Sequence, residues 1–142
     1  MKISKNYRMK EFEVSKSYPH LIEKVPKELQ CNVIFLVLKL LQPINDATGW
    51  INDITSGYRA PALNKAVGGV PTSQHAKGEA SDNNFRKGKI YRKPYEVASK
   101  VKELGLEYDQ MILYNTFVHL SYSRDNNRNQ LLYSRNYTGK RL

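Results

Sequence analysis

The chain has 142 residues, of which 40% are hydrophobic and 11% aromatic, and its 23 Lys and Arg residues against 13 Asp and Glu residues give a net charge of +10. This length favours a single domain over residues 1–142, and the aromatic content excludes a disordered chain. The one cysteine, Cys31, excludes an intramolecular disulfide framework and a multi-cysteine metal cluster. Because Cys31 lies inside the apolar run CNVIFLVLKLL, we expect it to be a small core residue.

No segment predicts export or membrane insertion. Residues 1–16 are basic but lack the apolar stretch of a secretory signal, and the apolar run 33–41 is interrupted by Lys39 and much shorter than the roughly 20 residues that span a bilayer. We therefore expect a protein made in the cytoplasm, with no signal peptide and no transmembrane segment. The positive charge favours an anionic partner, either a nucleic acid, a membrane surface or a bacterial cell wall.

The first half of the chain predicts one long helix and little else that is regular. This helix extends from about Pro26, which suits a first turn, to Gln42, with Pro43 as its stop. Its interior is apolar on nearly all sides, which is typical of a central buried helix. A short strand is expected around 51–55 and a short helix at 61–67, within a segment rich in Gly and Pro.

The second half predicts most of a sheet. A helix is expected at 94–104 because Val97, Ala98 and Val101 form one apolar stripe that ends before Gly105. Helices and strands occur in groups and do not alternate strictly, which favours the α+β class. The strands are predicted at 79–85, 108–114, 117–123 and 130–133, with a basic loop at 86–93 and a basic C-terminal end at about 124–142.

The residues that carry chemistry lie in 56–82 and in the strand 117–123. His75 and Asp82 supply imidazole and carboxylate groups, both good zinc ligands, and Gly78 between them allows a bend. Strand alternation points His119 away from the core face, so it is a candidate third ligand. A lone histidine on a strand is more often structural than a ligand, and the spacing alone leaves both interpretations open.

The segment Ser56–Asp82 reads SGYRAPALNKAVGGVPTSQHAKGEASD, and it is followed by DQ at 109–110 and VHLS at 118–121. This pattern resembles the family of zinc D-Ala-D-Ala carboxypeptidases and L-alanyl-D-glutamate peptidases, which includes D-Ala-D-Ala dipeptidases and many bacteriophage endolysins. The resemblance covers about residues 10–123. The family signature SxHxxGxAxD is matched in full by Ser73, His75, Gly78, Ala80 and Asp82.

The resemblance implies a small α+β fold with an antiparallel sheet and flanking helices, shared with the hedgehog signalling domain. It also implies a zinc ion held by His75, Asp82 and His119. Arg59 of the SGYR run would bind the substrate and stabilise the oxyanion formed at the scissile carbonyl. Ser73 would support the ligand loop at the substrate-binding site. The reaction would be metal-assisted hydrolysis of an amide bond, in which a general base removes a proton from water.

The chain departs from the family pattern at the position of the base. Relatives commonly carry an acid or a histidine three residues before the last zinc histidine, whereas this chain has Thr116 there. Asp109 is the best remaining carboxylate and is our candidate catalytic base. Glu107 is a weaker candidate, and Glu79 is discounted because strand alternation turns it away from Asp82.

The leading hypothesis is a monomeric zinc peptidase that cuts peptide stems of bacterial peptidoglycan, as a carboxypeptidase or an endopeptidase. The positive charge agrees with an anionic wall, and a phage-type endolysin that another protein releases to the wall is the context we expect. The alternative is a catalytically weak or inactive zinc domain that binds wall peptide or a protein partner, which Thr116 favours. No nucleic-acid partner is expected, because no helix-turn-helix, zinc-finger or aromatic RNA-binding signature is present.

Overall fold

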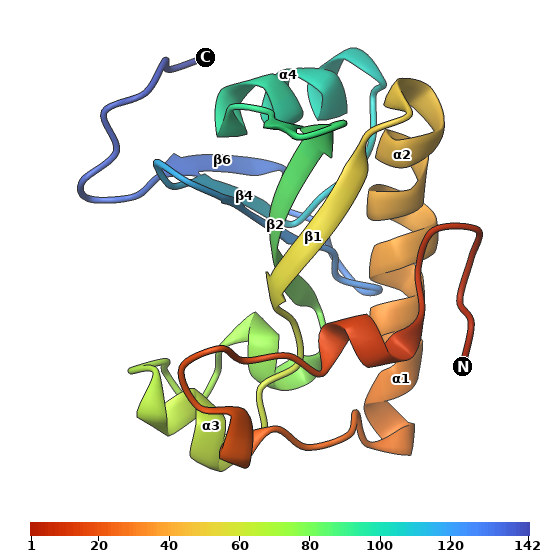
Figure 1. Ribbon diagram of the computed structural model, residues 1–142, viewed down its shortest axis with the longest axis vertical. Coiled ribbons are helices and arrows are strands. Elements are labelled where there is room, and N and C mark those ends of the chain that lie inside the picture. The colour runs from red at the N-terminus through yellow and green to blue at the C-terminus, as the bar shows by residue number, and fades with distance from the viewer.

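The computed structural model covers residues 1–142 and has a mixed sheet at its centre (Figure 1). Neighbouring strands are antiparallel except for the last, which pairs parallel to β4. The last strand is parallel because the loop before it leads the chain back to the end of the sheet at which its neighbouring strand begins. The strands, in spatial order, are β1 (Ile51–Ser56), β2 (Ala80–Lys87), β5 (Val118–Ser121), β4 (Gln110–Leu113) and β6 (Gln130–Tyr133), with β3 (Ile90–Tyr91) paired to the end of β2.

The long helix is longer than the sequence predicts. It consists of α1 (Lys27–Leu36), a wide π-helical turn η3 (Val37–Leu41) and α2 (Gln42–Thr48), and it ends at Gly49 with φ of 71°. The expectation that Pro43 stops the helix is wrong. In the π turn the Gln42 N–H bonds to the carbonyl of Val37, one residue further back than in an α-helix. This wider turn accommodates the ring of Pro43. In a regular α-helix the ring would clash with the carbonyl four residues earlier.

The core lies between this helix and one face of the sheet. Strand alternation divides the sheet into a core face, with Phe85, Val118 and Leu120, and an opposite face, with Asp82 and His119. Cys31 is exposed, which corrects its expected place in the core: it is about 200° around the helix from the buried Val33. The main contributors to the core from the long helix are Val33, Leu36, Val37, Leu40, Leu41 and Ile44.

The helix α4 (Pro94–Glu103) packs on β4 and β5 through Val97, Ala98 and Val101, as the apolar stripe predicts. The predicted basic loop before it contains the hairpin of β2 with β3. None of the helices is both long and apolar enough to cross a membrane.

The N-terminal segment, for which no element was predicted, contains two short 3₁₀ helices, η1 (Met9–Phe12) and η2 (Pro19–Leu21). It crosses the molecule close to the segment after β1, and Phe12 is completely buried. Its carbonyl accepts a hydrogen bond of 2.8 Å from the Tyr58 N–H. At Gly57 a Cβ atom would lie 2.6 Å from the backbone of Phe12, so this crossing requires glycine. The N-terminal segment thereby reaches the polar face of the sheet.

Candidate metal centre

Three side chains from two strands and one 3₁₀ turn meet on the polar face of the sheet. Asp82 on β2 and His119 on β5 are directly paired across the two strands, and His75 comes from η4 (Gln74–Lys77). One ligand atom from each residue lies within 4.8 Å of the other two, and all three residues are buried. The structure therefore brings together the three residues that the signature indicates.

The distances in this group fit a tetrahedral metal ion. The Oδ1 atom of Asp82 lies 3.3 Å from Nε2 of His75 and 3.3 Å from Nδ1 of His119. Zinc–nitrogen and zinc–oxygen bonds of about 2.0–2.1 Å separate neighbouring tetrahedral ligands by roughly 3.3 Å. The group has two imidazoles and one carboxylate, which is a donor set that zinc favours.

The orientation of His75 is fixed from outside the group. Its Nδ1 lies 2.9 Å from the carbonyl oxygen of Gly57 and donates a hydrogen bond to it, so that Nε2 is the ring nitrogen available as a metal ligand. The hydroxyl of Ser73 accepts a hydrogen bond of 3.2 Å from the His75 N–H, and Gly78, with φ of 73°, ends the turn. These contacts hold the imidazole as a metal ligand requires.

Electrostatics favour an ionised carboxylate at Asp82 and a neutral imidazole at His119. Burial alone would raise the pKa of Asp82, but ring N–H groups of His119 and His75 that face the carboxylate outweigh burial and hold the pKa well below its usual range; a bound metal ion takes the place of these protons. Burial lowers the pKa of His119, which favours its neutral form. A neutral imidazole and a carboxylate both offer lone pairs, and a divalent cation satisfies them together.

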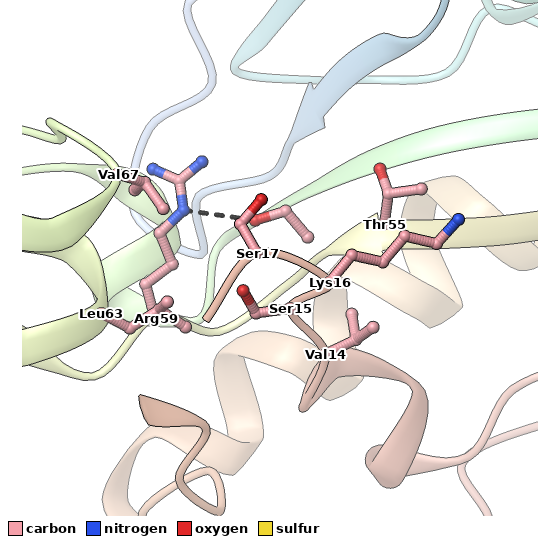
Figure 2. Close-up of a pocket in the computed structure, with 9 residues that line it drawn as sticks. Val14, Ser15, Lys16, Ser17, Thr55, Arg59, Leu63 and Val67 are labelled. Atoms are coloured by element: carbon pink, nitrogen blue, oxygen red, sulfur yellow. Dashed lines mark hydrogen bonds between the residues drawn. The ribbon is translucent and has the colours of Figure 1, made fainter. Parts of the chain in front are cut away.

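Arg59 lies beside the three ligands. Its Nη2 atom is 3.7 Å from Oδ2 of Asp82, and its Nε donates a hydrogen bond of 3.2 Å to the hydroxyl of Ser56. The Arg59 N–H also bonds to the carbonyl of His75 at 3.0 Å, just before the helix α3 (Pro61–Ala66) begins. The guanidinium borders an open cavity, so it is available to a bound substrate (Figure 2).

Asp109 lies outside the ligand group. Its carboxylate accepts hydrogen bonds from the Arg128 backbone (3.0 Å), from Nε and Nη2 of Arg128 (2.9 and 2.8 Å), and from Nε2 of Gln74 (2.6 Å). The hydrogen bonds from the Arg128 side chain are the main reason why the pKa of Asp109 is lowered. Because Gln74 precedes His75, Asp109 braces the turn that carries this ligand.

Tyr114 is a site residue that the sequence analysis missed. It follows β4 on the same face as Ile112, which is paired with His119, and its ring stacks on Phe117 at 4.2 Å between centroids. Burial raises the pKa of Tyr114, the charge of Asp82 adds to this effect, and Arg59 opposes it. One signal in the sequence could have identified Tyr114. Alternation of side chains, counted back from His119 through the tight turn, places Tyr114 on the same face of the sheet. Thr116, by contrast, is exposed in that turn.

The family described as Peptidase M15 matches residues 9–121, which is most of the chain. A search among curated proteins found no match. The matched range contains the whole ligand group, Arg59 and Tyr114, and it confirms the resemblance that the signature indicated. The chain therefore belongs to the peptidase M15 family and is a metallopeptidase.

Proposed function

We propose that this protein is a zinc-dependent peptidase that hydrolyses amide bonds in the peptide stems of bacterial peptidoglycan. The observation that carries the proposal is the buried group of His75, Asp82 and His119, with separations of 3.3 Å, beside Arg59. A zinc ion bound there would supply a Lewis acid that lowers the pKa of a water molecule and polarises the scissile carbonyl.

The protein would bind and orient the peptide through Arg59. Hydrolysis adds water across the amide C–N bond and gives a carboxylate and an amine, with negative charge developing on the carbonyl oxygen on the way. The guanidinium of Arg59 is held by Ser56 and lies next to Asp82, where a positive charge would stabilise that oxygen. Donors that are held in place before the reaction need no reorganisation as the charge develops.

The phenol of Tyr114 is a second donor for the same purpose. Its hydroxyl makes no hydrogen bond within the protein, and its ring is held by Phe117 on the face that carries His119. We assign it the role of a neutral hydrogen-bond donor to the substrate carbonyl. The base role of Asp109 stays a prediction, and its contacts with Arg128 and Gln74 favour a positioning role.

The lytic, endolysin-type role is proposed from the charge of the protein. The net charge of +10 and the basic hairpin of β2 and β3 would hold it on an anionic cell wall. Whether it acts as a carboxypeptidase on the terminal D-Ala or as an endopeptidase on the L-Ala-D-Glu bond depends on how the substrate is seated beside Arg59.

Digestion of purified peptidoglycan by the zinc-loaded protein tests this function. The fragments are analysed by mass spectrometry with and without chelator, and Asp82→Asn is the matched variant. We expect fragments that chelator abolishes, that Asp82→Asn does not produce, and whose masses identify the bond. If the protein holds one zinc ion yet releases no fragment from several wall types, the proposal is wrong and a zinc domain that only binds wall peptide is favoured.

A further inference from the structure

A cavity of about 250 Å³ adjoins the metal centre and has no role in the function described so far. Arg59 connects the two, because its guanidinium lies 3.7 Å from Asp82 while its side chain also lines the cavity. The N-terminal loop 14–17 forms one wall, and α3, with the buried Leu63, forms the other (Figure 2). A peptide bound at the metal centre can therefore extend into this cavity.

The polar groups of the cavity are cations and hydroxyls. Lys16 and Arg59 lie on opposite sides, with the hydroxyls of Ser15 and Ser17 between them, and the Lys16 side chain extends past Thr55 with its ammonium directed away from Arg59 (Figure 2). No acidic residue is among the nine that line the cavity. Two positive charges with hydroxyl donors and no carboxylate suit a small anion.

A backbone irregularity adds to this donor set. Consecutive residues of a strand normally point to opposite faces of a sheet, yet both Thr55 and Ser56 line the cavity. The pairing of β1 with β2 shifts register between Ile54 and Ser56, which is a β-bulge. The bulge allows both hydroxyls to face the same space, and the Ser56 hydroxyl already holds Arg59 in place.

We propose that this cavity binds a free carboxylate of the substrate near the scissile bond, and that Lys16 determines this specificity. The proposal rests on the proposed function and deepens it. A stem peptide offers two such carboxylates, the terminal one of D-Ala and that of D-Glu. The first would be seated by a carboxypeptidase and the second by an endopeptidase, so the carboxylate that the cavity takes indicates which bond is cut.

The test compares three stem peptides: one with both carboxylates free, one with the terminal carboxyl amidated, and one with the D-Glu carboxyl amidated. Because Lys16 is exposed, we expect amidation of the recognised carboxylate to raise KM of the wild type about threefold to fivefold, with little change in kcat. Lys16→Gln should raise KM for the free peptide by a similar factor and lose this discrimination. Lys16→Arg should retain it.

Lys24→Gln is the control, because it removes the same charge from another exposed position and leaves the cavity intact. If Lys16→Gln and Lys24→Gln behave alike, or if Lys16→Gln weakens all three peptides equally, the proposal is overturned. A wild type that cleaves none of the peptides contradicts the proposed function instead. In that case the carboxylate proposal is decided by calorimetry, with the same peptides N-methylated at the scissile amide. We expect Kd to differ between the free peptide and the peptide whose recognised carboxylate is amidated. Equal Kd values overturn the carboxylate proposal.

Discussion

Asp109→Asn separates a positioning role of Asp109 from a catalytic one. Asp109 is 3% exposed and accepts four hydrogen bonds, three of them from Arg128. Hydrogen bonds to a charged group stabilise by about 1.5–3 kcal/mol and neutral ones by about 0.5–1.5 kcal/mol. Arg128 is 47% exposed and regains water when the charge of Asp109 is lost. We therefore expect the variant to be destabilised by about 2 kcal/mol at pH 7.

The pH dependence of this loss has a defined sign. The ion pair with Arg128 lowers the pKa of Asp109 below its usual value, which is about 3.9 in an unfolded chain. The stabilisation is therefore complete above about pH 4 and is lost as the pH falls through the lowered pKa of the folded state. The difference in unfolding free energy between wild type and Asp109→Asn should be constant from pH 5 to pH 7 and shrink toward pH 3.

Urea denaturation of both proteins at pH 7, 5 and 3 measures this difference, and kcat is measured on the same samples at neutral pH. Asp125→Asn is the control, because it removes a nearby exposed carboxylate that accepts no side-chain hydrogen bond. A positioning residue gives the stability loss with a kcat reduced less than about tenfold. A variant as stable as the wild type with kcat reduced about 100-fold or more would identify Asp109 as the general base and refute the positioning role.

Tyr114→Phe should lower kcat about 100-fold with zinc content and KM nearly unchanged, and an unchanged kcat in steady-state kinetics would remove Tyr114 from the reaction. His75→Ala should lose bound zinc, whereas the control His20→Ala, at an exposed position in η2, should retain it. Mass spectrometry measures the metal content, and full zinc occupancy in His75→Ala would contradict the ligand assignment. Gly57→Ala should lower the unfolding free energy by about 1–3 kcal/mol, because the added Cβ would lie 2.6 Å from the Phe12 backbone. Urea denaturation measures this change. A variant as stable as the wild type would show that the N-terminal segment does not pack there in solution.

Patterns that depend on neighbouring residues predicted much of the fold. The apolar stripe of α4 and the alternation in β2 and β5 follow from local periodicity, and the structure contains these elements near the expected positions. The helix stop at Pro43 was wrong because the π turn before it depends on how the helix packs, which local propensity does not describe. The exposure of Cys31 was missed because the apolar run around it suggested burial on every side.

The site residues that belong to a sequence motif could be predicted. Those that are brought together only by the pairing of strands could not. His75, Asp82 and His119 were identified from the signature, and the structure places them within reach of one ion. Asp109 was selected because no other acid was better placed in sequence, and its partner Arg128 is 19 residues away and meets it only through the parallel pairing of β6. The position of Tyr114 likewise depends on the register of β4 with β5.

We propose that a zinc ion at the group of His75, Asp82 and His119 drives amide hydrolysis. The decisive experiment is a titration of zinc into the metal-free protein, with bound metal and turnover of a defined stem peptide measured in the same samples. We expect activity to rise in proportion to bound zinc and to level off at one ion per chain. Full activity before any zinc is added, or one bound zinc ion without turnover, would contradict it.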